Sequence, residues 1–225
     1  MKNFTQHNYR GNFAIPKADV LFDKDLKLIT IGFSWGEINP FQEVSETISN
    51  YFSASKNDFE STSPFDKIPS LSPLTNIMRT SLLISNEKIY RAHNKQSYVS
   101  GLELISIGIS GHELVIGQIG SFSTVLINKA FDPIILTSSS GVVTNDLASQ
   151  PPIPLNLMGT DNICYPQLTS VRFEPDDQLF VTAGPQFPTT FLNHNFKIKT
   201  DLSLLATELS NRNSQIPFWI GNCSL

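Results

Sequence analysis

Cysteine is scarce in this chain of 225 residues, which has only Cys164 and Cys223. Two widely spaced thiols form neither a zinc-binding pattern nor a disulfide framework, and they are compatible with a reducing compartment. No apolar run approaches the length of a transmembrane helix. The first residues, MKNFTQHNYRGNF, also lack the apolar stretch of a signal peptide. We therefore expect a cytoplasmic protein that does not enter a membrane.

Charge is scarce as well, because only 16% of the residues are Asp, Glu, Lys or Arg. The net charge of −4 and the absence of any run of Lys and Arg argue against a nucleic-acid partner. Apolar residues make up 40% of the chain, which argues against disorder. A chain of this length can bury a core without disulfides. We expect a single domain that spans residues 1–225.

The common catalytic motifs are missing too. No two histidines are spaced i, i+4, as in zinc-binding helices; the four stand at positions 7, 93, 112 and 194. The Ser-x-x-Lys at residues 53–56 stands without its partner motifs, and no Gly-x-Ser-x-Gly elbow occurs. The sequence therefore carries none of the frequent hydrolase signatures in intact form.

Helical spacing of apolar residues is present in three segments. In residues 39–53, Asn39 is placed to act as the N-cap and Pro40 as the first helical residue. Residues 72–92 predict a second helix, which Ser72 would cap. Residues 200–212 predict a third.

Strand-like patterns fill most of the remaining chain. Val20–Phe22 and Leu26–Phe33 predict a hairpin. Four strand candidates follow from residue 97 onward, and the second and third are predicted to form an antiparallel meander. Another hairpin is predicted over 169–183, turning at 174–177, and a last strand over 216–222. Grouped strands and grouped helices favour an α+β fold with helices packed on antiparallel sheets. The four middle candidates are residues 97–110, 112–120, 122–128 and 133–138.

Several phrases occur in an order that resembles a known family. The order and spacing are similar to those of the type 2C metal-dependent Ser/Thr protein phosphatases, the PPM family. The resemblance implies an α-β-β-α sandwich of two antiparallel sheets flanked by helices, with a site for two metal ions at one end. It runs from about residue 6 to residue 221. It rests on LITIGFSWGE (28–37), LLISNEKIYRA (82–92), SYVSGLELISIGISGHELVIGQIGSFSTVLI (97–127), PPIPLNLMGTDN (151–162), FEPDDQLFVTAGP (173–185) and SQIPFWI (214–220).

The departures from the family's pattern fall on its chemistry. The aspartate that bridges the metal ions corresponds to Ser34, and the glycine beside it to Trp35. The aspartate of the Ser-Asp-Gly phrase corresponds to Gly184, and the late Asp-Asn pair falls at Ser214 and the residue before it. Arg10 matches the phosphate-binding arginine, but the acidic pair that should follow it is absent. Mg²⁺ and Mn²⁺ require oxygen ligands, chiefly carboxylates, which these residues do not supply.

The resemblance therefore implies a catalytically inactive phosphatase-like domain, a pseudophosphatase that acts as a binding or regulatory module without a cofactor. Its expected partner is another protein, such as a phosphoprotein or a signalling regulator. Arg10, Trp35 and Glu37 are candidate contacts, although Trp35 could instead fill the space of the lost metal site. The alternative is a divergent metal-dependent phosphohydrolase, a protein phosphatase with a rearranged site that uses Glu37, Asp146 or Asp161.

Overall fold

The computed structural model describes residues 1–12, 15–57, 63–128, 132–138, 156–184, 202–212 and 214–225. The chain divides into two compact units. The central unit comprises Ala18–Gly120 and Asn156–Arg172, and the terminal unit comprises Met1–Lys17, Ser121–Leu155 and Phe173–Leu225.

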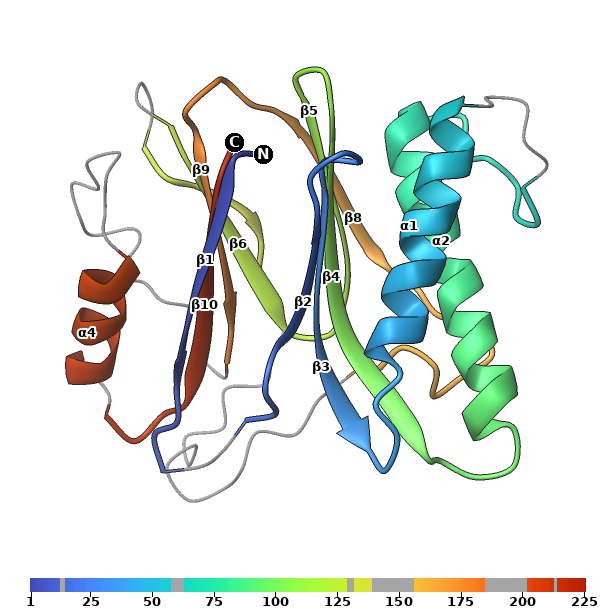
Figure 1. The fold of residues 1–225 in the computed structure, drawn as a ribbon, viewed down its shortest axis with the longest axis horizontal. Helices are drawn as coiled ribbons and strands as arrows, with labels where there is room; N and C mark the ends of the chain where they lie inside the picture. Colours follow the sequence, from blue (N-terminus) through green and yellow to red (C-terminus); the bar gives the residue numbers. More distant parts are fainter. Residues whose placement is uncertain (13–14, 58–62, 129–131, 139–155, 185–201, 213) are drawn as a thin grey trace. The chain divides into compact units, whose positions relative to one another are not determined.

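The central unit is built on a five-stranded antiparallel sheet of order β2-β3-β4-β5-β8 (Figure 1). Its neighbouring strands pair antiparallel, β3 with β2 and β4, and β5 with β4 and β8. The strands are β2 Asp19–Asp23, β3 Leu28–Gly36, β4 Ser100–Ser110, β5 Glu113–Ile119 and β8 Gln167–Arg172.

Two helices, α1 (Phe41–Asn57) and α2 (Pro73–Ile89), pack on one face of this sheet. Both begin where the sequence places their caps. Asn39 Oδ1 accepts the Phe41 N–H at 2.9 Å, and Ser72 Oγ accepts the Thr75 N–H at 3.1 Å. The apolar stripes of both helices form one core with the sheet, and this core includes Val44, Ile48, Phe52, Leu74, Met78, Leu82, Leu102, Leu104 and Val115.

The end of α2 is tied to the segment around Gly159. Asn86 is 2% exposed; its Oδ1 accepts the Gly159 N–H at 2.7 Å and its Nδ2 donates to the Asp161 carbonyl at 3.0 Å. A short π-helix, η1 (Tyr90–Asn94), continues α2. These contacts join the phrases at residues 82–92 and 151–162 on which the family resemblance partly rests.

The terminal unit contains a second antiparallel sheet, of order β1-β10-β9-β6-β7. Its first and last strands are neighbours, so the two chain ends lie side by side (Figure 1). Helix α4 (Leu202–Arg212) packs Leu202, Leu205 and Ala206 against one face of the sheet. The strands are β1 Asn3–Tyr9, β6 Phe122–Ile127, β7 Ile134–Thr137, β9 Gln178–Ala183 and β10 Phe218–Ser224.

Two predicted strand pairings are wrong. The strands of the expected hairpin at 169–183 lie in different sheets, since β8 pairs with β5 whereas β9 pairs with β6 and β10. The expected meander also fails, because β5 and β6 belong to different sheets. At both places the connecting residues have positive φ, 107° at Gly120 and 76° at Asp176. There the chain leaves one sheet and continues in the other instead of folding back into a hairpin. Turn-forming residues in the sequence are compatible with either path.

Strand β1 was not predicted. Its sequence, NFTQHNY, contains only two aromatic residues among polar ones, so it lacks the alternating pattern of a half-buried strand. It is an edge strand paired to β10 alone among the described strands, and most of its residues are exposed. Polar composition is typical of an edge that must not attract further strands.

Both cysteines are buried and free. Burial raises the pKa of Cys164 and of Cys223 from 9.0 to about 12. Each thiol therefore stays protonated at pH 8 and is a poor nucleophile. Among the described residues, no helix is both long and apolar enough to cross a membrane.

We predict that neither Cys164 nor Cys223 reacts promptly with an aromatic disulfide reagent at pH 8, whereas both react in denaturant. The raised folded-state pKa has a second consequence. The unfolded chain releases the thiol protons first, so the stabilisation is complete below about pH 9 and is lost as pH rises toward about 12. Denaturant titrations from neutral to alkaline pH measure this decline. One equivalent of fast reaction at pH 8 in the folded protein would contradict the burial.

Candidate functional site

The sequence-predicted site residues are divided between the two units, and each group has its own surroundings. Ser34, Trp35 and Glu37 follow one another at the end of β3 in the central unit. Arg10, Gly184 and Ser214 belong to the terminal unit. Asp146, named for the alternative rearranged site, lies outside the described residues.

The hydroxyl of Ser34 is part of a helix cap. Ser34 Oγ donates to Asn39 Oδ1 at 2.6 Å, and the same oxygen accepts the Phe41 N–H. Asn39 Nδ2 in turn donates to Asp19 Oδ2 at 2.8 Å. Ser34 thus connects the end of β3 to the start of α1 and, through Asn39, to β2. The sequence identified the Asn39 cap but gave no sign that Ser34 contributes to it.

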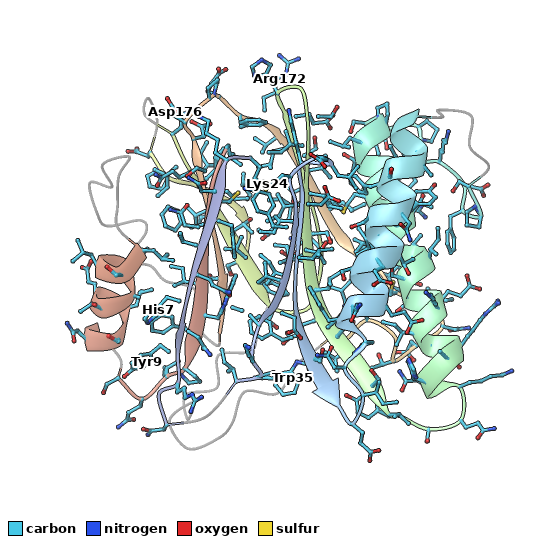
Figure 2. The ribbon with its side chains drawn as sticks, viewed as in Figure 1. His7, Tyr9, Lys24, Trp35, Arg172 and Asp176 are labelled. Carbon is cyan, nitrogen blue, oxygen red and sulfur yellow. The ribbon has the colours of Figure 1, made fainter. Side chains whose placement is uncertain are left out.

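The indole of Trp35 is paired with a carboxylate. Trp35 Nε1 donates to Glu103 Oε2 at 3.1 Å, and Figure 2 shows Trp35 at the end of β3. Glu103, on the neighbouring strand β4, is only 9% exposed. A Cβ on Gly120 would lie 2.7 Å from Glu103 Cγ, so glycine at 120 makes room for this side chain. Glu103 was not among the predicted site residues, although a single acid in the apolar run GLELISIGI is a visible signal.

The two acids of the alternative site that the structure describes lie at the surface. Glu37 is exposed and its backbone N–H donates to the Val99 carbonyl at 2.9 Å. Asp161 is also exposed, and its carbonyl accepts from Asn86. Within the described part of the chain, no three His, Cys, Asp or Glu side chains are grouped so that they could hold a metal ion.

In the terminal unit, three site residues gather at one end of the sheet. Tyr9 lies opposite Phe218, with ring centroids 5.2 Å apart, and its hydroxyl donates to the Ser214 carbonyl at 3.0 Å. Gly184 follows β9 on the other side of β10, where a Cβ would lie 3.1 Å from the Pro217 carbonyl oxygen. Because Arg10 directly follows Tyr9, the ends of β1 and β9 and the segment before β10 meet here.

This end of the sheet supplies backbone carbonyls, a hydroxyl and the exposed guanidinium of Arg10. Gly184 has φ +151°, which residues with a side chain rarely adopt. The described residues that form it, 9–12, 184 and 214–218, include no carboxylate. Its groups suit hydrogen bonding and anion contact rather than the coordination of a hard cation.

Solved structures of bacterial Ser/Thr phosphatases share this fold. The Mycobacterium tuberculosis serine/threonine phosphatase PstP/Ppp matches with a TM-score of 0.65 and 14% identity, over 99% of this chain and 98% of that one. PppA, described as a key regulatory component of T6SS in Pseudomonas aeruginosa, matches with a TM-score of 0.63 and 13% identity over 99% and 97%. The S. agalactiae serine/threonine phosphatase matches with 0.62 and 17% over 98% of each chain.

The predicted fold class is therefore confirmed: α+β, with two antiparallel sheets flanked by helices, as in type 2C phosphatases. The likeness lies in the structure and not in the sequence. No protein-family profile matches the chain, and no curated protein has a significantly similar sequence.

Proposed function

We propose that this chain is a phosphatase-like binding or regulatory module, a pseudophosphatase in which the type 2C fold persists without the metal-dependent chemistry. The observation that carries this proposal is the environment of Ser34. Its hydroxyl is committed to Asn39 in the cap of α1, at the position where the family resemblance calls for a metal-bridging aspartate. Ser34 therefore stabilises the start of α1, and this position offers no carboxylate to a metal ion.

The proposal follows from the charge that two metal ions require. Two divalent cations a few ångströms apart repel strongly, and bridging carboxylates make such a pair tolerable. The corresponding positions here are Ser34, Trp35, Gly184 and Ser214, of which none is acidic. Without the metals, a phosphatase of this type has neither an activated water nor a clamp on the phosphoryl oxygens.

Another protein is the partner that we propose, with a phosphoprotein or a signalling regulator as the favoured kind. Arg10 can contact a phosphate by a bidentate hydrogen bond, and Trp35 and Glu37 lie together at the end of β3. PppA shows that a protein of this fold can be a regulatory component. In this proposal the chain acts in the cytoplasm as a single domain of residues 1–225.

A second candidate function, a phosphohydrolase with a rearranged site, is favoured by Glu103. A nearly buried carboxylate on a rigid strand is a suitable ligand for a hard cation. It is weaker than the first candidate, because Glu103 Oε2 already accepts the Trp35 N–H. If this protein is an enzyme, a protein phosphatase is the activity that its fold supports best.

We predict no Mn²⁺-dependent hydrolysis of p-nitrophenyl phosphate or of a phosphothreonine peptide above the background without protein, and no saturable heat in a calorimetric titration with Mn²⁺. An active type 2C phosphatase serves as the positive control for both measurements. Metal-stimulated turnover that persists through repurification and is lost in Glu103→Gln would overturn the proposal in favour of the rearranged enzyme. Turnover unaffected by Glu103→Gln would contradict both candidates as stated.

A further inference from the structure

The central sheet ends in two edge strands, β2 and β8, each of which pairs with one neighbour among the described strands. An edge strand presents a row of backbone N–H and C=O groups to which another strand can bind. Natural edges are commonly protected by short length, a bulge, proline or charge. Strand β8 contains no proline, pairs with β5 over six residues without a shift in register, and has one charged residue, Arg172, at its end. It therefore lacks the usual protection.

The sheet register identifies the backbone groups of β8 that point outward. The Ile109 N–H donates to the Lys27 carbonyl, so the odd-numbered residues of β4 bond to β3 and the even-numbered ones to β5. Carried across β5, this alternation joins the odd-numbered residues of β8 to β5. The N–H and C=O groups of the even-numbered residues point away from the sheet. These outward residues are Leu168, Ser170 and Arg172.

Exposed apolar side chains lie directly before this edge in the chain. Ile163 is 59% exposed, and Tyr165, at 81%, is the most exposed large apolar side chain among the described residues. Neighbouring exposed apolar side chains favour a protein as the occupant of a surface. A second polypeptide strand would satisfy the outward backbone groups and bring side chains of its own to this region.

Strand β8 matches a second copy of itself. We consider antiparallel pairing about a two-fold axis that passes beside Ser170, so that Ser170 faces Ser170 of the other copy. All three outward residues then exchange backbone hydrogen bonds with the second copy, because Leu168 faces Arg172. Thr169 faces Val171, which pairs two β-branched side chains. No like charges face each other in this register.

The other edge of the sheet does not match itself in this way. By the same alternation, the outward residues of β2 are Val20 and Phe22. If these two residues pair with each other across a two-fold axis, Asp19 comes to lie opposite Asp23. Like charges directly opposite each other destabilise a strand pair. Self-association therefore favours β8 over β2.

We propose that two copies of this chain associate through β8, as a two-fold dimer in which the two central sheets join edge to edge. Two-fold dimers, in which both copies use the same surface, are the commonest oligomers. A contact made by one strand of each copy is small, so the dimer dissociates at low protein concentration. The contact lies on the central unit and does not depend on whether the protein hydrolyses phosphate.

Sedimentation equilibrium of the whole chain, from about 5 µM to about 500 µM, covers the range expected for a small interface. We expect a monomer at the low end and a dimer at the high end. Ser170→Pro removes an outward N–H without removing a bond to β5, so it should weaken association about tenfold or more. Ser170→Ala is the matched control, because it removes only the hydroxyl and should associate normally. Val20→Pro, the same change on β2, should also associate normally.

Amide hydrogen exchange locates the contact. The N–H groups of the three outward residues should exchange more slowly at the high concentration, whereas those of the odd-numbered residues of β8 should be protected at both concentrations. A monomer throughout the range would overturn the proposal, and so would a dimer that Ser170→Pro leaves unchanged or that Ser170→Ala abolishes. Outward amides that are already protected at the low concentration would also overturn it, because the edge would then be covered within one chain.

A charge exchange keeps the test decisive if Ser170→Pro does not fold. Ser170→Lys and Ser170→Glu each place two like charges beside the axis, so each variant alone should associate less than the wild type. A mixture of the two should form a mixed dimer, because opposite charges then face each other. A mixture that associates no more than the separate variants would overturn the proposal.

Discussion

Gly159→Ala is expected to lower the free energy of unfolding by about 3–4 kcal/mol, from a left-handed backbone and a forced overlap acting together. Gly159 has φ +88°, and a Cβ there would lie 2.3 Å from Ile89 Cγ2. Ile89, the last residue of α2, is 0% exposed in the core, and its Cβ would also lie only 2.8 Å from the new methyl group, so a rotation of the side chain alone does not remove the overlap. For a chain of this length the thermal midpoint should fall by roughly 10 °C.

Gly111→Ala provides the matched control. Gly111 also has positive φ, +58°, but no atom lies within 4 Å of the Cβ that alanine would add. This variant therefore has the backbone penalty without the overlap, and it should lose only about 1 kcal/mol. Denaturant unfolding of both proteins measures the difference. Equal losses would show that Ile89 moves aside freely and that the contact between α2 and the Gly159 segment is loose.

The double variant Gly159→Ala, Ile89→Ala tests the overlap itself. Ile89→Ala alone empties a core position and should be destabilising by about 2–5 kcal/mol. It also removes the Cγ2 atom that the new methyl group would meet. The double variant should therefore be less destabilised than the sum of the two single changes. Strict additivity would mean that the two residues do not compete for the same space.

The two ends of this contact fall in the segments at residues 82–92 and 151–162, so these two segments serve the frame of the central unit. Asn86 and Ile89 on α2, together with Gly159, preserve a buried arrangement whose geometry tolerates few substitutions. Ser34 and Gly184, which the sequence predicts as counterparts of metal-binding positions, are held by a helix cap and by a close approach to the Pro217 carbonyl.

The sequence could predict the elements better than their partners. Caps at Asn39 and Ser72 are local interactions, and apolar spacing identified α1, α2, α4 and most strands. Which strands pair depends on which strand at a sheet edge still lacks a partner, and no local sequence pattern shows that. For that reason β8 and β9 were wrongly joined.

The candidate site was less predictable than the fold. Its positions were inferred from the resemblance, but the role of Ser34 in the Asn39 cap and the pairing of Trp35 with Glu103 depend on contacts between strands. Glu103 lies 68 residues from Trp35 in the chain. Only the isolated acid in an apolar strand pointed to it, and such an acid needs a partner that the sequence does not name.

Trp35→Phe is expected to lower the free energy of unfolding by about 1.5–3 kcal/mol, because it removes the N–H that donates to Glu103 and leaves a nearly buried carboxylate with one donor fewer. Trp35→Ala should lose more, about 3–4 kcal/mol, since it also removes the packed ring. The ring is only partly buried. If the indole only fills space, Trp35→Phe should change the free energy of unfolding little, whereas Trp35→Ala should lower it strongly.

A double-variant cycle with Glu103→Gln isolates the hydrogen bond. Glutamine keeps a carbonyl oxygen for the indole but removes the charge, so Glu103→Gln should change stability less than Trp35→Phe does. If the indole stabilises the fold through this carboxylate, the two changes together should be less harmful than their sum by about 1 kcal/mol. Denaturant unfolding of the four proteins gives the coupling directly. If Trp35→Phe and Trp35→Ala both leave stability within about 0.5 kcal/mol of the wild type, the indole contributes little to the fold. The surface around Trp35 at the end of β3 would then be the first place to look for the binding site of the partner protein, because exposed tryptophans are frequent anchors of interfaces.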